Sequence, residues 1–192
     1  MIPKPHNQII MITKWLAVPI VSFFLLAALP LTSVSSDNGV QWLTMEEAQE
    51  QMLEEPRMVF VDVYTDWCGW CRRMTNETYT HPVIADYLNT HFYPVKLNAE
   101  QEGPIVFGGT TYINENIGQR RPTHSFAIAL LQGRMSYPSV VFFDEQMQLL
   151  TALPGFRPPA GMEAVLAFFK TGAYKENSDL DAFISGFEGT IE

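Results

Sequence analysis

The chain has 192 residues, of which 47% are hydrophobic and 17% are charged, so it can bury a sizeable core and is not expected to be disordered. The formal net charge is -9; residues 1–36 hold two lysines and no acid, which leaves 10 basic and 21 acidic residues, or -11, for the remainder. An acidic body argues against nucleic acid or anionic lipid as a partner. The length predicts one domain with appendages.

Residues 1–36 have the layout of a secretory signal. Two lysines precede an uncharged apolar run from Trp15 to Leu31, and small and polar residues follow from Thr32 to Ser36. A basic region, an apolar region and a small-residue cleavage zone, in this order, direct export. We therefore expect residues 37–192 to work in the periplasm. Two alternatives for the apolar run are an uncleaved anchor in the inner membrane facing the periplasm, and a buried core helix.

The first half of the mature chain alternates helical and strand patterns. Thr44 and Glu47 have the spacing of a capping box at a helix start. The expected elements are, in chain order, a helix over Thr44 to Glu55, a buried strand over Met58 to Tyr64, a helix that follows Cys68, a helix that begins at Thr80 or His81 with Pro82 in its first turn, and a strand over Phe92 to Leu97.

The pattern loosens over about residues 99–136, which we interpret as an insert. Short apolar pieces alternate with glycines, and Gln119 to Pro122 forms a basic island in an acidic protein. Thr123 is expected to cap a helix over His124 to Gln132, which Gly133 ends. Such an insert either decorates the scaffold or builds a wall beside its active site.

The C-terminal part predicts a hairpin and a strong helix. A strand over Ser139 to Phe143, a turn and a strand over Met147 to Leu153 precede a helix over Met162 to Lys170, and a short helix is expected over Asp179 to Ile184. Strands that alternate with helices and end in a hairpin predict an α/β fold with a mixed central sheet flanked by helices on both faces.

The only two cysteines, Cys68 and Cys71, lie between the strand that ends at Tyr64 and the following helix. A Cys-x-x-Cys at such a junction is typical of a redox site. Cys68 would lie at the helix N-terminus, which favours a thiolate, and Cys71 would follow one turn later on the same face. The alternatives are a structural disulfide, although so small a ring removes little chain entropy, and half of a zinc site, although the four histidines lack ligand spacing.

Four segments carry a family pattern. They are Val61 to Tyr64 leading into Trp67-Cys68-Gly69-Trp70-Cys71, then Lys96-Leu97-Asn98, then Tyr137-Pro138-Ser139, and finally Gly155-Phe156. In this order they resemble the thioredoxin superfamily over Met58 to Lys170, with the insert outside the minimal fold. The insert, which ends with Gly133-Arg134-Met135-Ser136-Tyr137-Pro138, is most similar to the exported, DUF255-like branch of thioredoxin-related proteins. The resemblance implies a thioredoxin fold with the insert before its cis-proline strand.

The resemblance implies catalytic roles for four residues. The Cys68 thiolate would attack a substrate disulfide, and Cys71 would resolve the mixed disulfide. Asp62 would accept the proton of Cys71, because a carboxylate inside an apolar strand is costly and has a raised pKa, and Lys96 would be its charge partner. The alternative is that Asp62 points to the solvated face of an edge strand.

Four further residues are candidates for substrate binding. Pro138 is expected to be cis and to bring backbone groups around Tyr137 beside the disulfide, where an extended substrate can pair with them; the alternative is an ordinary strand-entry proline. Trp67 and Trp70 would form an apolar collar that docks substrate, or would pack on the insert.

These features predict a thiol–disulfide oxidoreductase that acts on cysteines or disulfides of exported client proteins. The dipeptide Gly69-Trp70 lacks the proline of reducing thioredoxins and the histidine of oxidising or isomerising relatives, so the direction of electron flow stays open. We favour a reductase or isomerase. The Cys68–Cys71 disulfide is expected to be its redox group, with no bound cofactor and no metal, and a membrane-bound thiol protein would supply the electrons. The alternatives are a redox-silent binding or chaperone module and a carrier of a soft metal.

Overall fold

The computed structural model describes residues 39–176 and 179–191. The predicted signal or anchor over residues 1–36 therefore lies outside the described residues. Within the described ranges, no helix is long and apolar enough to cross a membrane.

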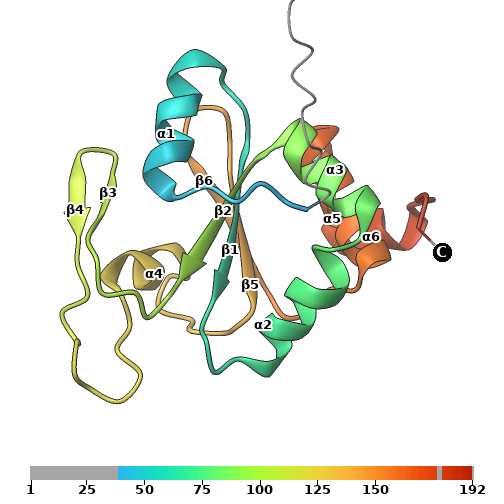
Figure 1. Ribbon diagram of the computed structural model, residues 1–192. Coiled ribbons are helices and arrows are strands. Elements are labelled where there is room, and N and C mark those ends of the chain that lie inside the picture. The colour runs from blue at the N-terminus through green and yellow to red at the C-terminus, as the bar shows by residue number, and fades with distance from the viewer. Residues whose placement is uncertain (1–38, 177–178, 192) are drawn as a thin grey trace, which may run out of the picture. The chain divides into compact units, whose positions relative to one another are not determined.

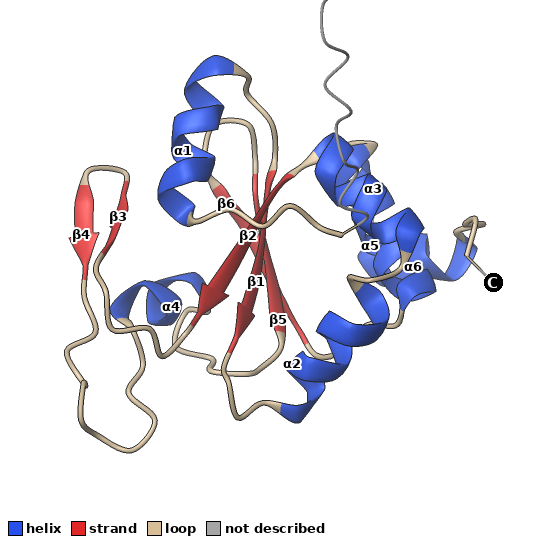
Figure 2. Cartoon of the chain, in the orientation of Figure 1, coloured by secondary structure: helices blue, strands red, loops and turns tan. Residues whose placement is uncertain are grey.

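A four-stranded mixed sheet forms the centre of the fold (Figures 1 and 2). Its strands are β1 (Val59–Tyr64), β2 (Tyr93–Asn98), β5 (Ser139–Phe143) and β6 (Leu149–Pro154). The order is β2-β1-β5-β6, in which β1 pairs parallel to β2 and antiparallel to β5, and β5 pairs antiparallel to β6. The predicted mixed sheet is confirmed, and β1 occupies a central place in it.

Helices cover both faces of this sheet, as Figure 2 shows. The described helices are α1 (Met45–Glu54), α2 (Gly69–Arg73), a π-helix (Met74–Thr78), α3 (Pro82–His91), α4 (Ser125–Leu130), α5 (Pro159–Lys170), a 3-10 helix (Ala173–Glu176) and α6 (Leu180–Gly186). Alternate residues of β1 point to opposite faces. Val59, Val61 and Val63 pack with α1 and α4, whereas Phe60 packs with α3 and α5.

The capping signals at the helix starts are only partly those expected. The Thr44–Glu47 capping box of α1 forms as predicted, and α3 begins with Pro82 after the N-cap His81. The cap predicted at Thr123 is wrong, because α4 begins at Ser125 and the ring of His124 accepts the N–H of Phe126. An imidazole acceptor one residue further along the chain takes the role that we expected of a hydroxyl.

Two strand and helix starts and one helix type also differ from the predictions. β6 begins two residues late, because Met147 adopts a left-handed turn conformation with a φ of 59°. α5 begins at Pro159 rather than Met162, since a proline is favourable in the first helical turn. Residues Met74–Thr78 form a π-helix, whereas the sequence pattern predicted only that the helix after Cys68 continues.

The insert contains a short antiparallel hairpin that packs beside α1. Its strands are β3 (Ile105–Phe107) and β4 (Thr110–Tyr112), and the two intervening glycines have positive φ values of 55° and 77°. Such a two-residue turn favours glycine because it needs left-handed backbone. Gln49 of α1 donates to the Val106 carbonyl at 2.7 Å and accepts the Gly108 N–H at 3.0 Å.

Candidate redox site

The two cysteines form a disulfide at the start of α2. Cys68 is the N-cap of this helix, and the backbone N–H of Cys71 donates to Cys68 Sγ at 3.0 Å. The helical path continues through the π-helix after Arg73, so several N–H dipoles point towards this end. Both cysteines are buried. The local fold thus places Cys68 at the N-terminus of a helix, the position that the motif predicted for it.

Asp62 lies on the central strand β1, directly opposite Lys96 of β2. Its side chain is 3% exposed, which rules out the alternative of a solvated edge strand. Lys96 Nζ approaches Asp62 Oδ2 at 2.5 Å and donates to Thr75 Oγ1 at 3.1 Å. Burial raises the pKa of Asp62 above its ordinary value even though Lys96 acts to lower it.

Three aromatic rings surround the Lys96 ammonium. It lies 4.7 Å from the Trp42 ring centre and 5.0 Å from those of Tyr64 and Tyr79. The Tyr79 hydroxyl is buried without a hydrogen-bond partner among the described residues, and burial beside Asp62 raises the Tyr79 pKa well above its usual value. The sequence contains no spacing that could have identified these rings, since they come from three separate segments.

A pocket of about 340 Å³ connects this ion pair to the disulfide. Its lining residues are Tyr64, Thr65, Asp66, Cys71, Arg72, Thr75, Asn76 and Lys96. Cys71 and Lys96 therefore face the same solvent-accessible space, with Asp62 directly behind Lys96. Water in such a pocket can carry a proton between a thiol and a buried carboxylate.

Trp67, on the other side of the disulfide, contacts both the insert and the loop before β5. Its indole N–H donates to Glu100 Oε1 at 2.8 Å, and the Arg121 guanidinium lies over its ring at 4.3 Å. Tyr137 packs edge-on against the same ring at 6.0 Å. The insert therefore builds a wall beside the disulfide, which was one of its two predicted roles. No sequence pattern pointed to Glu100, whereas the basic island over Gln119 to Pro122 was a signal for Arg121.

The two tryptophans do not form one collar. Trp70 packs against Phe156 at 5.5 Å, on the segment that enters α5, and makes no aromatic or hydrogen-bond contact with the insert within the described residues. Arg73 lies over both of these rings, at 5.4 Å and 4.8 Å. Only Trp67 follows the alternative of packing on the insert.

Pro138 follows a cis peptide bond from Tyr137, so the alternative of an ordinary strand-entry proline is wrong. Its carbonyl accepts the Gly155 N–H at 2.8 Å, which joins the starts of β5 and of the segment after β6. Burial, with the nearby Glu100 carboxylate, raises the pKa of Tyr137 to about 12, so its hydroxyl stays protonated at neutral pH. Tyr137 thus lies beside Trp67, the residue that precedes Cys68.

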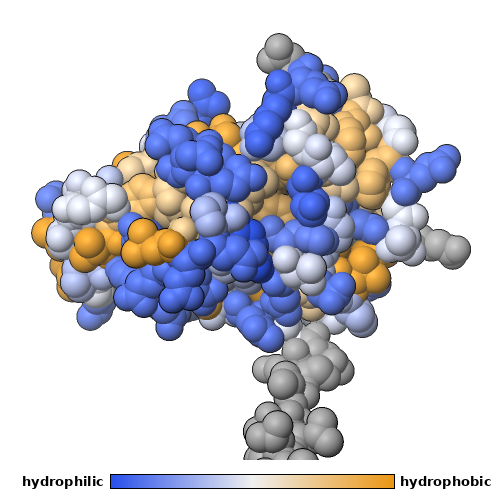
Figure 3. All heavy atoms as spheres, turned by 90° about the horizontal axis from the view of Figure 1, so that it is seen from above, coloured by the Kyte–Doolittle hydropathy of each residue, from blue (hydrophilic) through white to orange (hydrophobic). Residues whose placement is uncertain are grey.

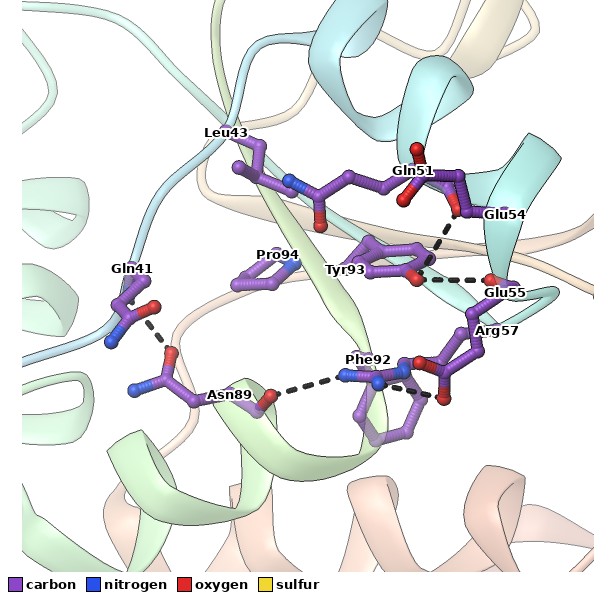
Figure 4. Close-up of a pocket in the computed structure, with 10 residues that line it drawn as sticks. All are labelled: Gln41, Leu43, Gln51, Glu54, Glu55, Arg57, Asn89, Phe92, Tyr93 and Pro94. Carbon is purple, nitrogen blue, oxygen red and sulfur yellow. Dashed lines mark hydrogen bonds and ion pairs between the residues drawn. The ribbon is translucent and has the colours of Figure 1, made fainter. Parts of the chain in front are cut away.

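A larger pocket of about 500 Å³ lies near the start of β2, away from the disulfide (Figure 4). Arg57 crosses this pocket, where it contacts Glu55, the Asn89 carbonyl and the face of Tyr93. Figure 3 views the molecule from the side at which β1 and β2 begin, and this surface is a mosaic of hydrophilic and smaller hydrophobic patches. Since neither cysteine lines this pocket and its Arg57 already pairs with Glu55, we do not assign it to the redox site.

Comparisons with known proteins agree with this architecture. A thioredoxin-fold protein from Helicobacter pylori aligns over 68% of this chain and 83% of its own, at 20% identity and a TM-score of 0.54. A thioredoxin from Thermus thermophilus aligns over 73% of this chain and 94% of its own, at 17% identity and a TM-score of 0.53. No curated protein matches the sequence.

A family model, Thioredox_DsbH, described as "Protein of unknown function, DUF255", matches residues 27–164, which is more than half of the chain. This match spans the disulfide, the insert and the cis-proline strand. The chain belongs to the Thioredox_DsbH (DUF255) family and has the thioredoxin fold.

Proposed function

We propose that the protein is a thiol–disulfide oxidoreductase that acts on cysteines of exported proteins as a reductase or isomerase. The observation that carries the proposal is the Cys68–Cys71 disulfide at the start of α2, where the Cys71 N–H donates to Cys68 Sγ. The family and the thioredoxin fold support the general class of thiol–disulfide oxidoreductase. The Asp62–Lys96 pair beside the pocket of Cys71 supports a resolving role for this cysteine.

In the reductive direction, two exchanges transfer two electrons from the protein to a client. The Cys68 thiolate attacks one sulfur of the client disulfide, forms a mixed disulfide and releases a client thiolate. Cys71 then loses its proton to Asp62 through water, attacks Cys68 Sγ and displaces the second client thiolate. The Cys68–Cys71 disulfide is restored, and both client thiolates take up protons.

The next cycle requires a thiol donor, because each turnover leaves the protein oxidised. We assign this role to a membrane-bound protein dithiol, which would attack the Cys68–Cys71 disulfide and become oxidised in turn. The export layout of residues 1–36 and the persistence of disulfides outside the cytoplasm support a periplasmic location.

The midpoint potential of the Cys68–Cys71 couple tests the proposed direction. We expect a value between about -180 and -270 mV, the range from disulfide isomerase to thioredoxin, together with reduction of insulin disulfides. A potential of about -120 mV would overturn the reductive assignment in favour of an oxidant. A Cys68 pKa of about 8.5 without insulin reduction would contradict the enzymatic role altogether.

Two further measurements separate the enzyme from its alternatives. A Cys68→Ser variant should lose the cellular role of the protein; its retention would favour a redox-silent chaperone. The reduced protein should bind copper(I) or zinc no more tightly than a small dithiol does, whereas tight binding would favour a metal carrier.

A further inference from the structure

We infer that Glu100 and Arg121 of the insert hold Trp67 as a fixed wall over Cys68, so that the site selects disulfides in extended, flexible client segments over disulfides embedded in folded surfaces. This inference rests on the proposed oxidoreductase function. Glu100 and Arg121 are positioning residues, because they contact Trp67 and neither cysteine.

Trp67 is exposed yet held on several sides. Trp67 is 46% exposed, and a tryptophan with this exposure is ordinarily free to change rotamer. Here a carboxylate accepts its indole N–H, a guanidinium covers its face and Tyr137 meets its edge. The hydrogen bond to a charged acceptor is the strongest of these contacts, so Glu100 should contribute most to the fixed position.

Arg121 itself occupies a restrained position. Its backbone is left-handed with a φ of 58°, which is costly for a residue with a Cβ and persists only where the surroundings impose it. Within the described residues Arg121 has no carboxylate partner, so no ion pair explains its place over the indole. The insert backbone thus presents the guanidinium to Trp67 at some conformational cost.

Trp67 and Trp70 flank a nucleophile that is itself nearly covered. Cys68 is 5% exposed, whereas the two tryptophans are about half exposed and therefore rise above it. A client sulfur must approach the Cys68 sulfur to about 3–3.5 Å before exchange. A rigid, folded surface meets the tryptophans first, whereas a protruding or extended segment can enter beside Trp67.

The space beside Trp67 suits such a segment. A cleft of about 380 Å³ lies there, a volume at the lower end of sites for small ligands. Its lining residues are Trp67, Glu100, Arg121, Thr123, Met135, Ser136 and Tyr137. The cleft combines aromatic surface with one cation and one anion, so it can take a short peptide stretch of mixed character next to the client cysteine.

The test compares two substrates, a short unstructured peptide with one intrachain disulfide and a folded protein with one surface disulfide. The wild type should have the higher kcat/KM for the peptide. Glu100→Ala and Arg121→Ala should lower the peptide-to-protein ratio of kcat/KM, by about tenfold for Glu100→Ala, the factor for loss of one hydrogen bond to a charged group. Glu100→Gln retains an acceptor for the indole and should keep the ratio.

Arg120→Ala is the matched control, since Arg120 is the exposed neighbour of Arg121 and makes no hydrogen bond or ion pair within residues that the structure describes. It should leave the ratio unchanged. In a Trp67→Phe background, which removes the indole N–H, Glu100→Ala should have no further effect. Unchanged ratios in both insert variants, or a shift of the midpoint potential that accounts for the change, would overturn the inference.

A second readout does not depend on activity. The Trp67 contribution to fluorescence, taken as the difference between wild type and Trp67→Phe, should be quenched more readily by acrylamide in Glu100→Ala and Arg121→Ala. Equal quenching in all variants would show that the insert does not hold Trp67. If the wild type reduces neither substrate but quenching responds as expected, the proposed oxidoreductase function is wrong, while the insert does hold Trp67 in place. Failure of the proposed function and failure of this inference are therefore distinguishable.

Discussion

At the scale of single residues, the placement of one carboxylate organises the site. Asp62 lies inside a strand whose other members are apolar, and the parallel register of β1 and β2 puts Lys96 directly opposite it. The ion pair offsets part of the cost of burying the charge, yet the pKa of Asp62 remains raised. Asp62 therefore takes up a proton at a higher pH than an exposed aspartate does.

The raised pKa of Asp62 predicts a pH dependence of stability. A carboxyl with a raised pKa stabilises the fold while protonated, below its unfolded pKa of about 3.9, and this contribution is lost as pH rises through the folded pKa. Asp62→Asn should therefore gain stability relative to the oxidised wild type as pH rises from about 4, until the difference levels off. Urea unfolding across pH measures this difference, and a difference that is constant with pH would contradict the raised pKa.

The resolving role of Cys71 predicts a trapped intermediate. Cys71→Ser keeps the attacking thiolate but cannot displace the client, so mixed disulfides between Cys68 and client proteins should accumulate. Non-reducing gels of cells that express the variant should show them. The double variant Cys68→Ser, Cys71→Ser contains no cysteine and is the control, which should show none. Adducts of equal amount in the control would show that the adducts are not disulfides of this protein.

At the scale of elements, side chains of α1 bond to the edge of β3 that has no neighbouring strand among the described residues. Glu46 and Gln49 bond to the backbone of β3, whose edge would otherwise meet only solvent. This anchors the N-terminal half of the insert, while His124 anchors its other end through a bond between its ring and the Gly103 carbonyl. The two anchors lie on either side of Arg121 along the chain, so the position of Arg121 depends on them.

Gln49→Ala should loosen the β3–β4 hairpin. It removes both bonds of this side chain to Val106 and Gly108, and we expect a loss of about 1 kcal/mol of stability, with faster hydrogen exchange at the Gly108 amide. Hydrogen exchange resolved by residue is the measurement. Glu50→Ala, on the exposed face of the same helix, is the control; equal acceleration there would trace the effect to α1 itself.

At the scale of the whole described domain, two apolar clusters lie on opposite faces of one sheet. The cluster beneath α3 and α5 is rich in aromatic rings, and Phe142 stacks on Phe169 at 3.9 Å. The buried carboxylate of Glu163 on α5 accepts N–H groups of Thr190 and Ile191, which binds the C-terminal segment to the same face. Stability therefore resides mainly in these clusters, while the redox site lies at the ends of β1 and β2.

Phe142→Ala should separate stability from redox chemistry. Removal of a fully buried phenyl ring should cost about 3–5 kcal/mol, because the surrounding rings cannot close the cavity. The midpoint potential should stay unchanged in the folded variant. Ile117→Ala, at an exposed position of the insert, should cost less than about 0.5 kcal/mol. Denaturant unfolding and redox titration test both statements, and a shifted potential in Phe142→Ala would contradict the separation.

The sequence alone predicted the features that local patterns encode. Apolar periodicity predicted the strands around Asp62, the Cys-x-x-Cys spacing predicted the disulfide, and the resemblance predicted the Asp62–Lys96 pair and the cis bond before Pro138. Such features depend on residues near in sequence or on strand pairing that the fold class sets.

Only the tertiary structure decided which distant side chains meet at the site. Glu100 and Arg121 reach Trp67 because the path of the insert brings them there, and Trp42 and Tyr79 meet at Lys96 from separate segments. A loop path depends on many weak contacts along its length, such as those of Gln49, and leaves no periodic pattern in the sequence. The direction of each such side chain follows from packing, which the order of residues along the chain does not reveal.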